Sequence, residues 1–179
     1  MNRHFISLAM IGSLFFIATA HADEDKWETH TSKEGKYSVS FPGKPTVPAP
    51  DKPDSPVGEL TVYKAQFTTA KGDQTYLVLY NDYPEAALAG TDKEAFLDGV
   101  RDGTQKTVGG KVASDKKITL GEKKYPGRDF LIEKGSEPAY HARAYIVGNR
   151  LYQLVIMGPK DAATGKDADK FLDSFKLSQ

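Results

Sequence analysis

The feature that most constrains this chain is a pair of strand-like runs, residues 140–147 and 151–157, on either side of Gly148-Asn149. A two-residue connection of this type between β-rich runs is a strong signal for a β-hairpin. With this loop, Val147 faces Arg150 across the hairpin. The register then pairs further residues in the same way: Tyr145 with Tyr152, Arg143 with Leu154 and His141 with Ile156. The other face carries Ala142, Ala144, Ile146, Leu151, Gln153, Val155 and Met157.

Further strand-like runs lie on both sides of one helical segment. Residues 27–31, 37–41, 58–69, 74–83, 111–120 and 128–133 favour strands, and residues 70–73 are typical of a hairpin turn. The intervening helix is expected to begin with a capping box, Thr91 to Glu94, and to end at Gly109-Gly110. Its apolar stripe is Phe96, Leu97, Val100, Thr104 and Val108. Gly99 and Gly103, one turn apart, suggest that it approaches a sheet closely.

A second helix closes the chain. Ala168, Phe171, Leu172 and Phe175 follow the spacing of one helical face, and the helix is expected to begin near Thr164 or Asp167. Residues 77–80 are apolar on both strand faces, which indicates helices on both sides of the sheet. The sequence therefore predicts the α+β class: a three-layer α/β/α sandwich with a mainly antiparallel central sheet.

The N-terminus has the zones of a secretory signal peptide. A short basic start precedes an apolar run over residues 5–20, and Ala20-His21-Ala22 predicts cleavage after Ala22. The run is shorter than the roughly 20 apolar residues of a membrane span. We expect residues 1–22 to be removed and residues 23–179 to form one periplasmic or secreted domain without membrane insertion. Lipoprotein processing is excluded because the chain has no cysteine.

A proline-rich segment, residues 42–57, lies within this domain. It holds six of the ten prolines of the chain and predicts an extended surface loop. Its repeated Pro-x-x-Pro spacing is also compatible with a second role, in which the segment binds an aromatic groove of a partner protein.

Three landmarks occur in a characteristic order. They are residues 37–45 (YSVSFPGKP), residues 125–130 (YPGRDF), and residues 148–154 (GNRLYQL) followed by 171–177 (FLDSFKL). This order resembles a group of small exported bacterial domains of unknown function that share the PsbP-like, or DcrB-like, α/β/α fold. The resemblance implies a fold and a compartment. It implies no activity and no site residue, because similar folds host many functions.

Little in the sequence points to chemistry. Without cysteine, and with only His30 and His141 outside the leader, there is no framework for a metal or cofactor, and none is expected. No catalytic residue can be assigned. The most prominent polar group is His141, Arg143 and Tyr145 on one predicted strand, a speculative binding cluster that could equally be ordinary sheet surface. A net charge of about −1 after cleavage gives no general attraction to nucleic acid.

These features favour a non-catalytic binding or scaffold domain of the cell envelope, with a protein or small-ligand partner of unknown identity. Two alternatives remain. One is a small hydrolase outside the cytoplasm that uses His141 and Arg143, which leaves the enzyme question open. The other is a carrier whose tyrosines, all nine within residues 23–179, line a cleft for a small ligand.

Overall fold

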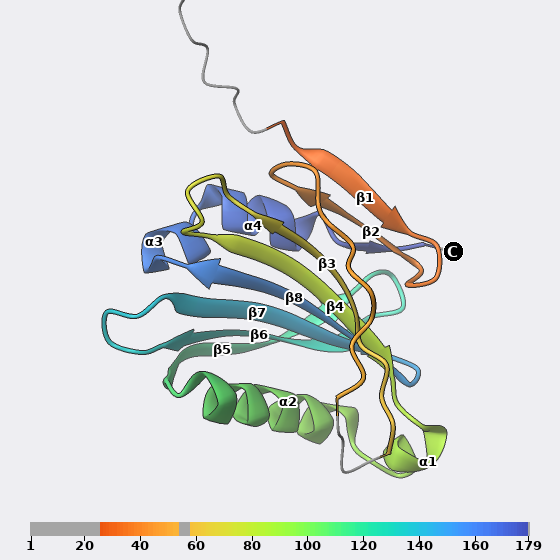
Figure 1. The fold of residues 1–179 in the computed structure, drawn as a ribbon. Helices are drawn as coiled ribbons and strands as arrows, with labels where there is room; N and C mark the ends of the chain where they lie inside the picture. The colour runs from red at the N-terminus through yellow and green to blue at the C-terminus, as the bar shows by residue number, and fades with distance from the viewer. Residues whose placement is uncertain (1–25, 54–57, 179) are drawn as a thin grey trace, which may run out of the picture.

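The computed structural model describes residues 26–53 and 58–178 (Figure 1). The predicted leader and part of the proline-rich segment lie outside the described residues. A six-stranded antiparallel sheet dominates the molecule, in the order β3-β4-β8-β7-β6-β5. Its strands are β3 (Tyr63–Thr68), β4 (Thr75–Asp82), β5 (Lys111–Leu120), β6 (Tyr125–Glu133), β7 (Ala139–Val147) and β8 (Arg150–Gly158).

The predicted hairpin occupies the centre of this sheet. β7 and β8 pair in the expected register, with Val147 opposite Arg150, Tyr145 opposite Tyr152 and His141 opposite Ile156. Gly148 in the turn has a φ of 64°, a left-handed conformation that glycine adopts without strain. The hairpin between β3 and β4 is confirmed as well, although β3 begins at Tyr63 and not at Gly58.

Helix α2 (Lys93–Val108) covers one face of the sheet (Figure 1). Leu97 is its fully buried residue and packs with Phe130, Ile146 and Val155 of the sheet. The predicted capping box is wrong by one residue: Asp92, not Thr91, is the N-cap, and its carboxylate accepts a hydrogen bond from the Ala95 amide. Gly109 ends the helix in the left-handed conformation, as expected.

The opposite face carries a mixed layer (Figure 1). Helix α4 (Lys166–Asp173) and the short helix α3 (Lys160–Ala163) lie beside a second, three-stranded sheet of order β1-β2-β9. The strands of this sheet are β1 (Glu28–Ser32), β2 (Tyr37–Phe41) and β9 (Lys176–Leu177), and one further short helix, α1 (Glu85–Leu88), follows β4. The protein is thus a mixed α/β structure. The strands predicted at residues 27–31 and 37–41 are confirmed as β1 and β2, but with β9 they form a second sheet in a layer that was expected to be helical.

An aromatic core lies between the two sheets. Tyr37 of β2 stacks on Phe175 at a centroid distance of 5.5 Å and meets Tyr80 and Tyr152 edge to face. Phe171 of α4 is fully buried in the same core. The apolar stripe predicted for the closing helix is therefore confirmed, and Phe175 belongs to the core although the helix ends two residues before it.

The two edges of the large sheet are protected differently. The proline-rich segment precedes β3 in the chain and lies alongside it, with isolated antiparallel bridges from Thr46 to Gln66 and from Asp51 to Val62. At the other edge, β5 is mostly exposed, is interrupted by a bulge between Val112 and Ser114, and carries several lysines. Charge and bulges are common devices that prevent edge strands from pairing with other chains. Over the residues described, no helix is both long and apolar enough for a membrane span.

Candidate functional site

The polar cluster predicted from sequence lies on β7, beneath α3 and α4. His141 and Arg143 point to the same carboxylate, Asp129 on the neighbouring strand β6. The His141 Nε2 atom lies 2.9 Å from one oxygen of Asp129, and the Arg143 Nε atom lies 2.6 Å from the other. Arg143 also donates to Asp173 of α4 at 2.6 Å, and the His141 Nδ1 atom lies 2.8 Å from the Ala163 carbonyl oxygen of α3.

Both nitrogens of His141 thus face oxygen acceptors, an arrangement that suits the protonated imidazole. Burial lowers the pKa of His141, but the hydrogen bonds to Asp129 and to the Ala163 carbonyl outweigh burial and raise it overall. Burial would raise the pKa of the Asp129 carboxyl, yet His141 and Arg143 hold it below its usual value. The cluster is a charged connection between the sheet and the two helices, with no lone pair on His141 free for catalysis.

Tyr145, the third predicted residue, is a core residue. It is 4% exposed, and its ring lies parallel to that of Phe175 at a centroid distance of 6.0 Å. Burial raises the pKa of Tyr145, and the Arg143 guanidinium opposes this rise. The other histidine, His30 on β1, packs against Tyr37 and Phe41, and burial lowers its pKa. Among the described residues, no group of three or more His, Asp or Glu side chains could hold a metal ion.

A second ionic cluster joins α2 to β5 and β6 on the other face. Arg128 is 6% exposed and pairs with Asp98 of α2 and Asp115 of β5. Arg101 of α2 pairs with Asp115 and with Asp102. Arg128 lies on the face of β6 that packs against α2, and the aspartates around it balance its buried charge.

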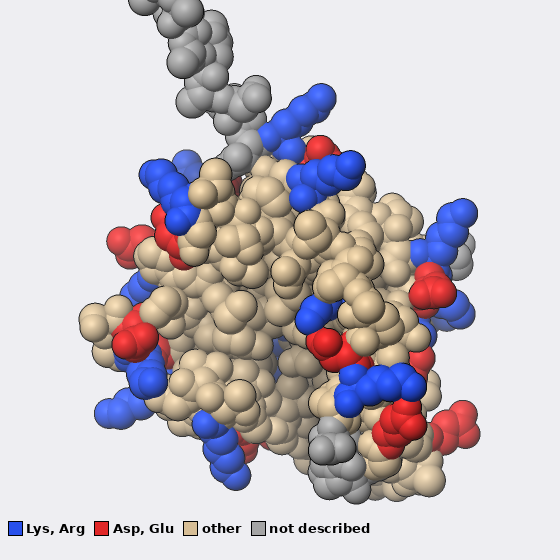
Figure 2. All heavy atoms as spheres, in the orientation of Figure 1, with Lys and Arg blue, Asp and Glu red and all other residues tan. Residues whose placement is uncertain are grey.

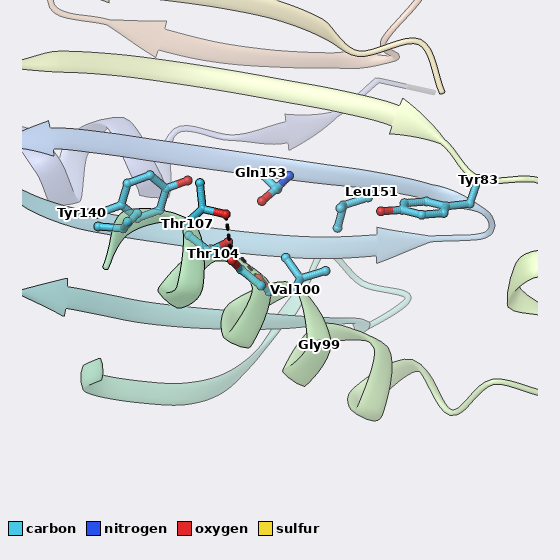
Figure 3. Close-up of a pocket in the computed structure, with 10 residues that line it drawn as sticks. Tyr83, Gly99, Val100, Thr104, Thr107, Tyr140, Leu151 and Gln153 are labelled. Carbon is cyan, nitrogen blue, oxygen red and sulfur yellow. Dashed lines mark hydrogen bonds between the residues drawn. The ribbon is translucent and has the colours of Figure 1, made fainter. Parts of the chain in front are cut away.

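A hollow of about 350 Å³ lies between α2 and the large sheet (Figure 3). Leu151 and Gln153 of β8 form its floor, and two tyrosines, Tyr140 of β7 and Tyr83 after β4, stand at its two ends. The α2 side of the hollow consists of Gly99, Val100, Gly103, Thr104, Thr107 and Val108. The space-filling view shows the surface hollowed just above α2 (Figure 2).

Two helix glycines line this space. The sequence suggested that Gly99 and Gly103 let α2 approach the sheet closely, and this expectation is wrong. A Cβ atom built on either glycine would meet nothing within 4 Å. Both glycines are exposed and belong to the lining of the hollow. Each costs helix stability relative to alanine, and neither allows a closer approach to the sheet.

The lining of the hollow is uncharged and combines polar with apolar side chains. The hydroxyls of Thr104 and Thr107 donate to the carbonyl oxygens of Val100 and Gly103, at 2.8 and 3.0 Å, so that each retains lone pairs. Burial raises the pKa of Tyr140 to about 12, and it also raises that of Tyr83. Both tyrosines therefore stay neutral and can donate as well as accept hydrogen bonds.

Comparison with known proteins supports the fold. No protein-family model and no curated protein sequence matches this chain. Among solved structures, the solution structure of cyanobacterial PsbP (CyanoP) from Synechocystis sp. PCC 6803 matches with a TM-score of 0.54 and 14% identity. The match covers 93% of this chain and 98% of that chain. The fold is PsbP-like. At this identity the likeness concerns the fold alone.

Sequence reasoning found the cluster around His141 and missed the Arg128 ion pairs and the hollow. His141 and Arg143 were singled out because the hairpin register places them side by side. Asp129 was missed, since its pairing with β7 depends on the register of a longer connection. The hollow was missed because a helix glycine gives the same signal whether it faces a packed sheet or an open space. The only available signal was the presence of two glycines one turn apart inside a helix, where alanine would form the helix more readily.

Proposed function

We propose that this protein is a non-catalytic binding domain of the cell envelope, and that the hollow between α2 and the large sheet is its ligand site. The observation that carries the proposal is the pair Gly99 and Gly103. Two glycines in the interior of a 16-residue helix destabilise it, and the fold gains no closer packing from them. What they provide is an open, polar cavity.

The ionisable groups support a non-catalytic role. His141, Arg143 and Asp129 are bound to one another and to α3 and α4, so a base or nucleophile there would first have to break the connection between layers. The neutral lining of the hollow offers no general base near physiological pH. The hydrolase that uses His141 and Arg143 is therefore the weaker hypothesis.

The leader supports the proposed location. Residues 1–22 would direct the chain out of the cytoplasm and be cleaved after Ala22, leaving residues 23–179 as one periplasmic or secreted domain. We further propose that its layers correspond to the three-layer α/β/α sandwich, with β1, β2 and β9 added to the helical layer of α3 and α4. Cell fractionation with N-terminal sequencing tests the location: a product that begins at Asp23 outside the cytoplasm is expected, and an uncleaved cytoplasmic chain would refute it.

A binding screen tests the site. Residues 23–179 are screened by ligand-observed NMR against a chemically mixed set of small molecules, together with the variants Gly103→Leu and Ala95→Leu. Position 103 lines the hollow, and a Cβ atom there meets no atom within 4 Å, so a leucine at this position places its bulk beside the ligand. Ala95 is exposed on the same helix and does not line the hollow, so leucine at position 95 is the matched control. We expect ligands that bind the wild type and Ala95→Leu and are lost with Gly103→Leu. Equal binding by all three proteins, or no binding at all, would contradict the proposal.

A further inference from the structure

We infer that the hollow over α2 binds a neutral, hydroxylated ring of the size of one sugar unit. This inference rests on the proposed function and specifies the class of its ligand. It follows from three properties of the described residues: the absence of charge in the lining, the placement of hydrogen-bonding groups, and the volume between the two tyrosines.

The absence of charge excludes ionic ligands. The ten described residues that line the hollow include no Asp, Glu, Lys, Arg or His. A carboxylate or ammonium group that entered would lose hydration without gaining a counter-charge, which is costly. Arg101 and Arg128, which also pack around α2, are already paired with aspartates and are not free to neutralise a ligand carboxylate.

The hydrogen-bonding groups suit a ligand with several hydroxyls. Across residues 26–53 and 58–178, neither the side-chain amide of Gln153 nor the hydroxyl of Tyr140 has a hydrogen-bond partner. In Figure 3 the two tyrosine hydroxyls point toward each other along the hollow, and Gln153 lies between them. Thr104 and Thr107 add acceptors on the opposite wall. A sugar hydroxyl both donates and accepts, so neighbouring hydroxyls can bond to the amide and to these oxygens together.

Size and apolar surface complete the assignment. The volume of about 350 Å³ lies at the lower end of the roughly 300–1,000 Å³ range of ligand sites, which favours a single ring over a long chain. Val100, Val108 and Leu151 supply apolar patches between the polar groups. This alternation matches the C–H faces and hydroxyl edge of a pyranose. A lipid tail would leave the Gln153 amide without a partner.

Matched sugars test the inference. Neutral hexoses and N-acetylhexosamines, free and at the end of a short oligosaccharide, are titrated into ¹⁵N-labelled protein beside the uronic acids of the same rings. We expect the neutral sugars to shift the amide signals of Gly99, Gly103 and Gln153, and the uronic acids to bind at least tenfold more weakly. The two neutral forms distinguish a free sugar from the end of a glycan.

Variants identify the bonds. Gln153→Leu is expected to weaken binding about tenfold, and Tyr140→Phe several-fold, as for a lost hydrogen bond to a ligand. Gln66→Leu makes the same change on β3, outside the hollow, and is expected to bind normally. Uronic acids that bind as well as neutral sugars, or an unaffected Gln153→Leu, would overturn the inference. If only aromatic or lipid compounds from the screen bind and Gly103→Leu blocks them, the binding site stands and the sugar assignment falls.

Discussion

Replacement of the two helix glycines by alanine should stabilise the protein. Gly99 and Gly103 lie in the interior of α2, at positions where a methyl group would meet no other atom within 4 Å. Glycine costs about 1 kcal/mol relative to alanine in a helix interior, mainly through backbone entropy. Because neither methyl group causes a clash, the double variant should gain about 2 kcal/mol in the free energy of unfolding.

Thermal and urea unfolding of residues 23–179 measure this gain. For a domain of this length, about 2 kcal/mol corresponds to a rise in Tm of about 4 to 8 °C. Gly127→Ala is the matched contrast. A Cβ atom there would lie 2.4 Å from the Tyr145 ring and 2.9 Å from the Ala144 carbonyl oxygen, so this variant should lose about 1–3 kcal/mol.

A lower Tm for Gly99→Ala and Gly103→Ala would refute the reasoning. It would mean that the helix already touches the sheet at these positions, as the sequence alone suggested, and that the hollow is filled in solution. A gain in stability combined with weaker ligand binding would instead show that the chain retains these glycines for the sake of the cavity.

Three further predictions concern the contacts between layers. Asp129→Asn removes the carboxylate shared by His141 and Arg143, while Arg143 keeps its ion pair with Asp173. The variant should cost about 1–3 kcal/mol in urea unfolding, because two partly buried groups lose a charged partner; a loss below about 0.5 kcal/mol would contradict this. The pKa of His141 is raised, so the stability that the charged imidazole contributes is complete below about pH 6.5 and is lost as the pH rises through the raised pKa. His141→Gln should therefore lower the free energy of unfolding more at about pH 5.5 than at about pH 9. An equal loss at both pH values would argue against a charged imidazole. Tyr152→Phe removes the hydrogen bond that the buried hydroxyl donates to the Gly35 carbonyl oxygen (2.7 Å). It should lower the free energy of unfolding by about 1 kcal/mol and speed hydrogen exchange in the turn before β2. Unchanged exchange in this turn would be the contrary result.

The sequence was most informative where local chemistry determines geometry. The β7–β8 register follows from a two-residue turn and was correct in every pair predicted. The stripe of α4 follows from helical spacing and was also correct. The N-cap of α2 was misplaced because Thr91 and Asp92 are adjacent and both residue types cap well, so the choice depends on the backbone.

Long-range contacts were beyond the sequence. The partners of His141 and Arg143 come from β6, α3 and α4, and nothing local fixes how those elements meet. For the same reason the sequence predicted β1 and β2 as strands but not that they form a separate sheet with β9. Its strand β9 has two residues, too few for a periodic pattern, and it is recognisable only through its pairing with β2.

The strand order has a consequence for how this chain acquires its shape. β4 pairs with β8, with Asp82 opposite Arg150, and β2 pairs with β9 near the C-terminal end of the described residues. Before the final hairpin and helix are present, the strands of the first half can form only the pairs β1–β2 and β3–β4, and isolated two-stranded pairs are marginally stable. Pairings so distant along a polypeptide form slowly. A chain threaded through a narrow pore from its N-terminus would thus complete its two sheets only after its C-terminal end had passed.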